Sequence, residues 1–556
     1  MGQVEEIRVE RDAVGSTDGE QIEFQWLLSL FDEDTDDVRV FRERASKLAR
    51  EFVHSSQITA GTELRSLREA FGGARVPEDP AGLPEYINFL ENKIIPHSMH
   101  VSSRRFIGHM TSALPCLLRE LGTLLVAMNQ NTVKLETSKS VSLMERQAIG
   151  MLHRLIYHMP DRFYQEHVQD AESTLGVITS GGTVANTTAL WCARNCTLVA
   201  CEGFAGVEVE GMPAALNHYG YNGAAIIGSS LMHYSLDKAA ALLGLGSGNL
   251  LRVPVNAENR VNVAALRRRI KECRDRGICV LAIVGIGGTT ESGAIDPLDQ
   301  LADIAEEFGI HYHVDAAWGG AMQFSRKYRS RLSGIERADS VTIDGHKQMY
   351  LPMGTGMAVF RDPKLARVIE KQARYIVRRG SYDLGRRSLE GSRPANALYV
   401  HAAFHSLGRK GYELLIEESV RKAAYLYERV RQSAEFEPIV APQMNILTYR
   451  YLPEWARPRA QTLELTPEEQ VSINEINQQL QRLQRAAGKS FVSRTTLETT
   501  RYGAGIPIVV LRAVLANPLT TDEDIDTVLR EQVAHGAEAE AICQEINRVA
   551  QSGAAG

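Results

Sequence analysis

Short β-branched or apolar runs alternate with helix-like segments between residues 101 and 400, and this alternation constrains the fold more than any other feature of the sequence. The runs predicted as strands are residues 175–179, 224–228, 280–285, 311–315, 340–343 and 357–360. Such a pattern is typical of an α/β domain whose mainly parallel sheet is buried on both faces. Ligands of these sheets bind outside the carboxyl ends of the strands, so the residues that follow each run are candidate site residues.

The 556 residues exceed the size of one ordinary core and predict two or three domains. Residues 1–22 have little apolar periodicity and are predicted to form a flexible tail. Residues 23–100 have the amphipathic pattern of a helical N-terminal segment. The large α/β domain is expected to span residues 101–400.

Residues 401–556 are predicted to form a smaller α+β domain. Strands are expected near residues 445–452 and 508–514, and a final helix is expected from Thr521. Within this domain, segment 457–494 is rich in Gln, Arg and Glu. It is predicted to be an inserted, solvated helix without chemistry.

The charge balance excludes several classes of partner. The 62 basic and 68 acidic side chains leave a net charge of −6, which offers no basic surface to nucleic acid or to an anionic membrane. No run approaches the about 18 consecutive apolar residues of a membrane span, and the N-terminus lacks a signal-peptide pattern. We therefore expect a cytosolic protein that acts on a small molecule.

Three of the seven cysteines, Cys192, Cys196 and Cys201, lie close together in the sequence. Their spacing is not the C-x2-C of common zinc sites, and no histidine lies nearby to complete a metal site. Buried core thiols are the preferred interpretation, and no metal is expected.

Residues 179–183, with the sequence TSGGT, follow a predicted strand and begin a predicted helix. Backbone N–H groups at a helix N-terminus bind anions, and glycine allows the backbone to approach a phosphate closely. Gly182 and Thr183 are therefore candidate phosphate ligands. An ordinary turn capped by Thr is the alternative, and the motif alone does not decide between the two.

Two charged residues end predicted strands. Asp315 is costly to bury unless it meets a cation, and a protonated pyridine nitrogen is such a partner; the alternative is a helix cap. Lys347 ends the run Asp-Gly-His-Lys, where desolvation would lower its pKa enough to make it a nucleophile. Taken singly, Lys347 suits a structural lysine and His233 suits a packed core histidine.

Together, a phosphate cradle, an aromatic residue, an acid and a lysine follow one another in this order along one α/β domain. This order resembles the group II pyridoxal-phosphate (PLP) dependent amino-acid decarboxylases, which include glutamate, aromatic amino-acid and cysteine-sulfinate decarboxylases. The resemblance runs from about residue 101 to about residue 526, and its most specific motifs are DAAWGG at 315–320, the His346-Lys347 pair and LRAVLANP at 511–518. It implies a fold type I architecture with a mainly parallel seven-stranded sheet, PLP as cofactor and a homodimer.

The resemblance also implies roles for individual residues. Lys347 would form the Schiff base with PLP, and Asp315 would hold the pyridine nitrogen. His233, also a candidate catalytic residue, would stack on one ring face, and Ala317 would pack on the other. The remaining implied cofactor contacts are Gly182, Thr183, Thr289 and His346, while Arg512 would bind the substrate α-carboxylate and Tyr375 would protonate Cα. Asp344 departs from the pattern, because several members of the family have Asn beside the phosphate.

Two segments, 106–115 and 129–139, resemble a bacterial branch, the PLP-dependent aspartate 1-decarboxylases. Arg105, His109, Asn131 and Lys134 lie in or beside them and are candidates for binding the side chain of a small acidic amino acid. Glutamate and cysteine-sulfinate decarboxylases remain alternatives, because a single methylene discriminates by only about 1–3 kcal/mol. Another PLP reaction on the same fold and a catalytically silent homologue are the more distant alternatives.

Overall fold

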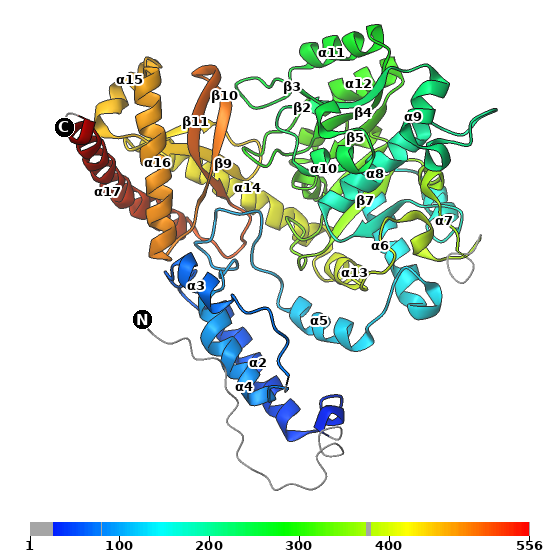
Figure 1. The fold of residues 1–556 in the computed structure, drawn as a ribbon, viewed down its shortest axis with the longest axis horizontal. Coiled ribbons are helices and arrows are strands. Elements are labelled where there is room, and N and C mark those ends of the chain that lie inside the picture. Colours follow the sequence, from blue (N-terminus) through cyan, green and yellow to red (C-terminus); the bar gives the residue numbers. More distant parts are fainter. Residues whose placement is uncertain (1–25, 79, 374–379, 555–556) are drawn as a thin grey trace.

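The structure is a computed structural model that describes residues 26–78, 80–373 and 380–554 (Figure 1). It consists of an N-terminal helical segment, a large α/β domain and a C-terminal domain with its own sheet. The predicted tail at residues 1–22 lies outside the described residues.

Seven strands form the central sheet of the large domain. They are β1 (Gly176–Thr179), β2 (Gly223–Ser229), β3 (Leu250–Val253), β4 (Ile278–Ile286), β5 (His311–Asp315), β6 (Ser340–Asp344) and β7 (Gly356–Phe360). Their spatial order is β1-β7-β6-β5-β4-β2-β3, and only β7 runs antiparallel to its neighbours. The predicted mainly parallel seven-stranded sheet is confirmed. The sequence does not predict β3, because this strand is four residues long, lies at the sheet edge and contains Arg252.

Helices cover both faces of this sheet (Figure 1). Those of the large domain are α5 (Leu117–Met128), α6 (Ser140–Tyr157), α7 (Asp161–His167), α8 (Gly182–Thr197), α9 (Val207–Tyr219), α10 (Ser235–Leu242), α11 (Val263–Asp275), α12 (Leu298–Phe308) and α13 (Ala397–Ser406). Successive residues of β2 enter different cores: Ile227 packs in the cluster that contains Leu266 of α11, whereas Ile226 packs in the cluster that contains Leu190 of α8. This alternation is the reason that the strands are apolar on both faces.

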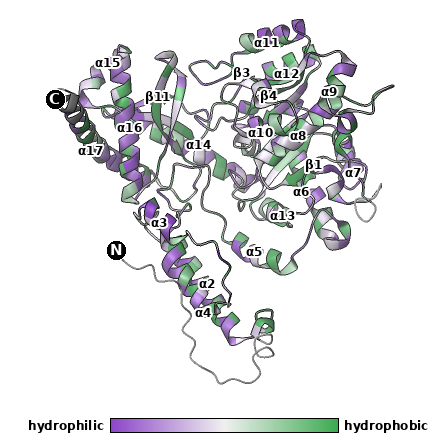
Figure 2. Ribbon diagram, viewed as in Figure 1, coloured by the Kyte–Doolittle hydropathy of each residue, from purple (hydrophilic) through white to green (hydrophobic). Residues whose placement is uncertain are grey.

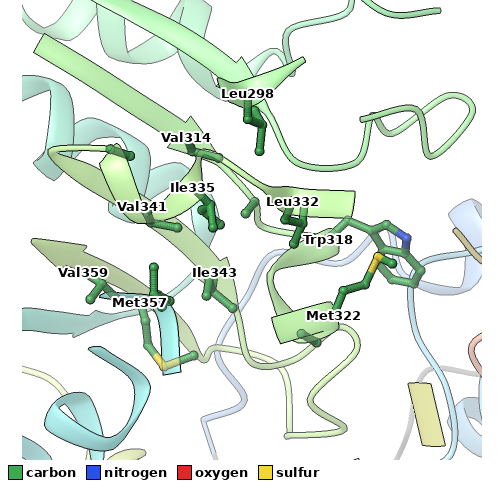
Figure 3. Packing of buried hydrophobic residues seen from close by; sticks show 14 of the residues in the cluster. Leu298, Val314, Trp318, Met322, Leu332, Ile335, Val341, Ile343, Met357 and Val359 are labelled. Atoms are coloured by element: carbon green, nitrogen blue, oxygen red, sulfur yellow. The ribbon is translucent and has the colours of Figure 1, made fainter. Parts of the chain in front are cut away.

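The larger core cluster continues from the sheet to the loops at its carboxyl edge. Figure 3 shows Val314 of β5 and Ile343 of β6 in the same packed layer as Trp318 and Met322. All four side chains are buried, and each contributes roughly 1.5–3 kcal/mol of transfer free energy to the folded state. The strand ends that carry the candidate site residues are therefore held in place by a tightly packed core.

The C-terminal domain has a four-stranded antiparallel sheet in the order β10-β11-β9-β8. Its elements are α14 (Gly408–Gln432), β8 (Phe436–Val440), β9 (Ile446–Tyr451), α15 (Arg457–Thr462), α16 (Pro467–Ala487), β10 (Ser493–Thr500), β11 (Gly503–Val514) and α17 (Asp522–Ala554). The small α+β domain is thus confirmed, and it has two strands, β8 and β10, that the sequence does not predict.

Segment 457–494 is expected from the sequence to be a solvated helix, but one side of its helix α16 is buried. Ile473 and Leu480 are fully buried in the C-terminal domain. The Asn477 amide accepts a hydrogen bond from the Tyr451 N–H (2.8 Å) and donates to the Tyr451 carbonyl (2.9 Å). The Asn474 amide accepts from the Val509 N–H (2.8 Å). The buried polar side chains of Asn474 and Asn477 on α16 therefore satisfy sheet backbone groups, while Glu468, Glu475, Arg482 and Arg485 on its other side are exposed.

The residues around Ile107, predicted to begin the large domain, belong to the C-terminal domain instead. Ile107 packs in the core of the C-terminal domain, its N–H donates to the Phe491 carbonyl (3.0 Å), and its carbonyl accepts from the Val514 N–H (2.6 Å). The chain thus enters the C-terminal sheet at residue 107, long before it builds the rest of that domain. The expected boundary at residue 101 is wrong for this stretch.

The N-terminal segment is helical, as expected, with α2 (Asp36–His54), α3 (Leu64–Ala70) and α4 (Leu83–Phe89). In Figure 1, α2 and α4 form an arm that extends away from the two domains, and Figure 2 shows hydrophobic residues among its hydrophilic ones. Several large apolar side chains of the segment are exposed: Leu27, Leu28, Phe31, Leu64, Phe71 and Val76.

The three neighbouring cysteines differ in their surroundings. Cys192 is buried as expected, but Cys196 and Cys201 are exposed, so the interpretation as core thiols is wrong for these two. Within residues 26–78, 80–373 and 380–554, no group of three or more His, Cys, Asp or Glu residues is arranged to hold a metal ion. No helix in those ranges is long and apolar enough to cross a membrane.

Candidate active site

A cavity of about 300 Å³ lies at the carboxyl ends of the parallel strands. The predicted cofactor residues Gly182, Thr183, His233, Asp315, Ala317, His346 and Lys347 all line it. These residues follow four different strands, so the fold and not the local sequence brings them together. Ligand pockets of this kind have volumes of about 300–1,000 Å³, so the cavity suits a small-molecule cofactor.

The N-terminus of α8 forms one end of the cavity. Gly181, at φ 155°, precedes the helix, and no side chain caps the first N–H groups. A Cβ atom on Gly182 would come within 2.8 Å of the Asp344 carboxylate, so any larger residue would have to displace that side chain. The arrangement suits a phosphate, because uncapped N–H groups and the helix dipole both favour an anion.

Asp315 lies at the end of β5 and is buried. Its Oδ2 accepts a hydrogen bond from the Asn186 side chain (2.9 Å), and its Oδ1 accepts from the Ala317 N–H (3.1 Å). Donors on both oxygens stabilise the ionised carboxylate. A buried anion in a ligand cavity fits the protonated ring nitrogen of PLP.

Lys347 follows β6, and its Nζ lies 2.9 Å from Oδ2 of the buried Asp344. The other carboxylate oxygen, Oδ1, has no hydrogen-bond partner in the part of the chain that the structure describes. The Nδ1–H of His346 donates to the Thr355 carbonyl oxygen (2.9 Å), and its Nε2 lies 3.8 Å from Asp344. Asp344, which departs from the family pattern, therefore pairs with Lys347, the lysine expected to bind PLP.

His233 follows β2, and its Nδ1 lies 2.9 Å from the Ser235 hydroxyl. The Ser235 N–H also donates to the same nitrogen (3.2 Å). Desolvation lowers the pKa of His233, and the positive charge of Lys347 lowers it further, against the opposing effect of Asp315. The imidazole is therefore held neutral, as suits a ring that packs on a flat cofactor.

The predicted contact at Thr289 falls one residue away from the cavity. The Thr289 side chain is buried in a turn, where its hydroxyl oxygen accepts from the Ala294 N–H (3.1 Å) and contacts Ser292 (3.1 Å). The next residue, Thr290, lines the cavity. Thr290 is therefore better placed than Thr289 for a contact with a bound cofactor.

Arg512 comes from β11 of the C-terminal sheet and is nearly buried. Its Nε has no hydrogen-bond partner among the described residues. Desolvation lowers the pKa of Arg512, and the nearby carboxyl group of Glu291 opposes this effect. A buried guanidinium with an unused donor is ready to bind a carboxylate.

His109 and Glu291 lie close to Arg512. His109 remains exposed to solvent, yet desolvation and the charges of Arg512 and Lys347 lower its pKa. Desolvation raises the pKa of Glu291, whose Oε2 lacks a partner within the described ranges. Ile107 is hydrogen-bonded to residues 491 and 514 of the C-terminal domain, and this pairing brings His109 close to Arg512.

Neither Arg512 nor His109 lines the cavity, and the structure does not bring the other candidate side-chain ligands to it either. Arg105 pairs with Asp524 at the start of α17 (3.3 Å). Asn131 donates to the Ser392 hydroxyl (3.3 Å), and Lys134 pairs with Glu136 (2.7 Å).

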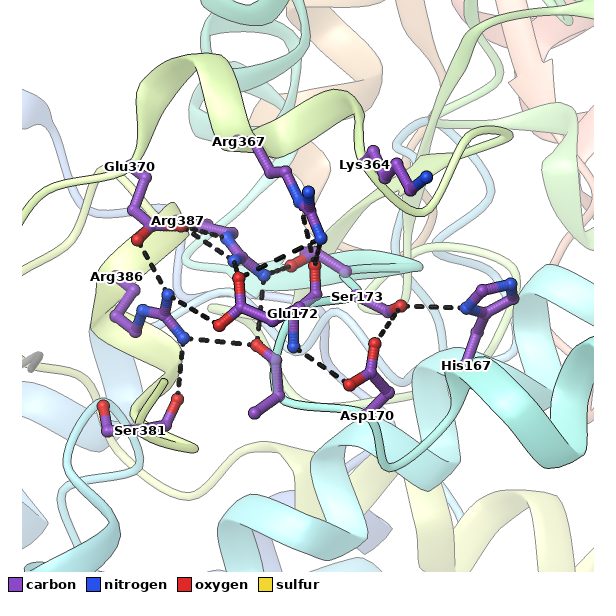
Figure 4. Close-up of polar contacts among 12 residues, drawn as sticks. His167, Asp170, Glu172, Ser173, Lys364, Arg367, Glu370, Ser381, Arg386 and Arg387 are labelled. Atoms are coloured by element: carbon purple, nitrogen blue, oxygen red, sulfur yellow. Dashed lines mark hydrogen bonds and ion pairs between the residues drawn. The ribbon is translucent and has the colours of Figure 1, made fainter. Parts of the chain in front are cut away.

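Tyr375, the predicted proton donor, lies outside the described residues. The chain on either side of residues 374–379 is anchored: the Lys371 N–H donates to the Arg386 carbonyl (2.8 Å), and Glu370 pairs with both Arg386 and Arg387 (2.7 Å each). Figure 4 shows this cluster, which also includes Glu172. The two arginines are buried, so the ends of this stretch are fixed to the large domain.

Three residues near the cavity escape the sequence analysis: Asn186, Thr290 and Glu291. Asn186 occupies a buried position of α8 between Ala185 and Thr187. The sequence gives no clear signal for it, because Thr187 and Thr188 beside it are also polar and buried. Glu291 has no signal either, since a charged residue in a turn is ordinarily exposed.

Comparison with known proteins agrees with this geometry. The pyridoxal-dependent decarboxylase conserved domain matches residues 69–452, and the chain belongs to this family. It is accordingly a PLP-dependent carboxy-lyase.

Individual relatives refine the comparison. The chain is 45% identical over 497 residues to an aspartate 1-decarboxylase of Aliivibrio fischeri, which covers 89% of this chain and 90% of the relative. It is 27% identical over 422 residues to an L-2,4-diaminobutyrate decarboxylase of Acinetobacter baumannii, covering 74% and 79% of the two chains. Among solved structures, mouse CSAD has the same fold, with a TM-score of 0.78, 22% identity and coverage of 90% and 99%.

Proposed function

We propose that the protein decarboxylates L-aspartate at Cα, releasing CO2 and forming β-alanine. The 45% identity to an aspartate 1-decarboxylase over 89% of the chain carries this proposal. The positive charge of Arg512 and the imidazole of His109, which lies close to both Arg512 and Lys347, suit a substrate with two carboxylates. Glutamate and cysteine sulfinate are the rival substrates.

The residues of the cavity fit PLP, which when bound supplies an electron sink for the bond that is broken at Cα. We propose that Lys347 binds it covalently and that Gly182 and Thr183 hold its phosphate. Asp315 would keep its ring nitrogen protonated, while His233 and Ala317 would pack against its two ring faces and His346 and Thr289 or Thr290 would complete the contacts.

Arg512 would bind the α-carboxylate of the substrate. Its planar guanidinium can grip a carboxylate with two donors and so orient the group that leaves. Because the site is largely desolvated, this contact is stronger than it would be in water. His109 is proposed to contact the side-chain carboxylate of the substrate. Arg105 and Asn131 could contact it only if a second subunit supplied them to the site.

The test is product identification with the purified enzyme. Aspartate, glutamate, cysteine sulfinate, 2,4-diaminobutyrate, tyrosine and tryptophan are offered separately, and kcat/KM is measured for each. We expect aspartate to be the fastest. If glutamate or cysteine sulfinate reacts faster, that amino acid replaces aspartate as the proposed substrate. A faster reaction of an aromatic or basic amino acid would contradict an acidic substrate altogether.

Tyr375 is proposed to deliver the proton that replaces CO2 at Cα. A phenol that reaches a desolvated site only with substrate present would protonate this carbon in preference to the cofactor. Tyr375→Phe removes one oxygen and little volume, so folding and PLP binding should survive while the ratio of amine to aldehyde product falls. An unchanged ratio together with the wild-type rate would remove Tyr375 from the mechanism.

We also propose a homodimer that acts in the cytosol. Support for the dimer comes from the N-terminal helical segment, whose exposed apolar side chains include Phe31, Leu64 and Phe71. Such side chains on one projecting segment favour burial against a second copy. Sedimentation of the full chain should give twice the mass of one chain, and Phe71→Asp should shift it toward monomer. Cell fractionation tests the location.

A further inference from the structure

One amide in the cavity wall, that of Asn186, joins the three elements α8, β5 and α10. Asn186 of α8 is almost fully buried. Its Nδ2 donates to Asp315 at the end of β5 (2.9 Å) and to the Ser235 hydroxyl at the start of α10 (3.0 Å). Its Oδ1 lies 3.0 Å from Nε2 of His313, also on β5.

The chemistry of these partners fixes the direction of each hydrogen bond. An ionised Asp315 can only accept, so the Asn186 atom that faces it is the NH2 group. The Asn186 oxygen must then face a donor, which places the proton of His313 on Nε2. The Nδ1 of His313 accepts from the Ser340 hydroxyl of β6 (2.9 Å). Desolvation lowers the pKa of His313 to about 4, so this ring stays neutral.

The second branch reaches His233. Because Ser235 accepts from Asn186, its hydroxyl hydrogen is free to point at His233 Nδ1 (2.9 Å), and the Ser235 N–H points at the same atom (3.2 Å). Two donors on Nδ1 leave no room for a proton there. His233 is therefore the neutral tautomer that carries its proton on Nε2.

We propose that Asn186 is a positioning residue that sets two states of the cofactor site at once, the ionised Asp315 and the neutral Nε2–H tautomer of His233. This inference rests on the PLP-dependent activity but not on which amino acid is the substrate. Every member of the network except Asp315 is neutral, so the carboxylate keeps its full charge for the cation that it meets.

His233 is sensitive to this network because several charges face it. Asp315 and Asp344 favour its protonation, and Lys347 and Lys238 oppose it. Tyr234 packs on the imidazole at 4.2 Å between ring centroids and adds no charge at neutral pH. Desolvation is the largest influence and lowers the pKa of His233, and the two hydrogen bonds to Nδ1 favour the same neutral form.

The test compares Asn186→Ala and the isosteric Asn186→Asp with Asn195→Ala. Asn195 lies on the same helix, is also buried, and its amide donates to the Val368 carbonyl (2.8 Å), away from the cavity. The dissociation constant of PLP is measured for each purified enzyme. Loss of a charge-assisted hydrogen bond should weaken PLP binding about tenfold to hundredfold in both Asn186 variants and leave it unchanged in Asn195→Ala.

The His233 branch has its own readout, the pH dependence of the absorbance of bound PLP. Ser235→Ala removes one donor to Nδ1, so the pKa of His233 should rise and the acid transition should move to higher pH. Combining it with Asn186→Ala should shift the transition by less than the sum of the single shifts, because both act through one chain of bonds.

The outcomes separate two failures. If Asn186→Ala and Asn186→Asp bind PLP as tightly as wild type, or if the transitions of the single and double variants add, the inference is wrong while the proposed function stands. If Asn186→Ala does not fold, the isosteric Asp variant decides alone. A wild-type enzyme that turns over a different amino acid changes the proposed substrate and leaves the inference intact.

Discussion

The two sides of the candidate site differ in how fully their polar groups are bonded. On the side of Asp315, the carboxylate, Asn186, Ser235 and His233 form a continuous network. On the side of Arg512, which does not itself line the cavity, two buried polar atoms have no partner among the described residues: Arg512 Nε and Glu291 Oε2.

Buried polar atoms without partners are rare in proteins, because each costs about 1–3 kcal/mol. The two unpartnered atoms beside Arg512 suit a region that a ligand completes, whereas the side of Asp315 is organised in advance. A prebuilt network suits a resident cofactor, and an incomplete one suits a substrate that comes and goes. Variants on the two sides should therefore fail in different ways.

Lys347 lies between the two sides, so its loss should have the largest effect. Lys347→Ala is expected to reduce kcat/KM by a factor on the order of 10³ or more. Borohydride reduction and peptide mass spectrometry should find PLP on Lys347 in the wild type and on no lysine in the variant. Lys364→Ala, at an exposed position, is the control. PLP trapped on another lysine with full turnover would contradict the assignment.

Asp315→Asn tests the prebuilt side. The variant keeps the shape and removes the charge, so kcat should fall about 10²–10³-fold and PLP should be released more easily. The KM for the substrate should change little, because the Arg512 side is untouched. Exposed Asp303 supplies the control Asp303→Asn. If kcat and PLP affinity were both unchanged, the comparison between the two sides would break down.

Arg512→Lys tests the incomplete side. The charge remains but the planar fork is lost, so kcat/KM should fall about tenfold to hundredfold. PLP affinity should equal that of the wild type, in contrast to Asp315→Asn. Release of PLP from this variant would mean that the two sides do not act separately.

Glu291→Gln should have the smallest effect and a characteristic pH dependence. Desolvation raises the pKa of Glu291, and Arg512 and Arg252 partly oppose this. As pH rises through that pKa, the ionised carboxylate offsets the charge of Arg512, so the KM should rise a few-fold in the wild type and stay flat in Glu291→Gln. The stability that the neutral carboxyl contributes is present at low pH and is lost over the same rise. A wild-type profile in Glu291→Gln would exclude this role.

The sequence predicts the sheet side of the molecule well for a physical reason. Strand β4 is buried almost throughout, so its residues are apolar and the strand stands out in the sequence. Strand β10 alternates buried and exposed residues at the edge of a sheet and contains many Thr and charged residues, so it does not stand out. The polar face of α16 misleads in the same way, because its partners are backbone groups of distant strands.

The candidate site follows the same division. Asp315, Lys347, His233 and Gly182 are predictable because each follows a recognisable strand. Asn186 and Glu291 are not, because what makes them important is contact with residues far away in the sequence. Arg512 is predicted only through the resemblance to the family, and its neighbour Glu291 is identified only from the structure.

The pairing of residue 107 with residues 491 and 514 has a consequence for how the enzyme is made. A ribosome releases Lys347 well before Arg512, so the PLP-binding residues are synthesised while the substrate-binding arginine is still missing. The segment near residue 107 must wait for the last quarter of the chain before its sheet can close, and contacts this distant form slowly. We expect newly made chains to acquire the capacity to hold cofactor before they acquire the capacity to recognise substrate.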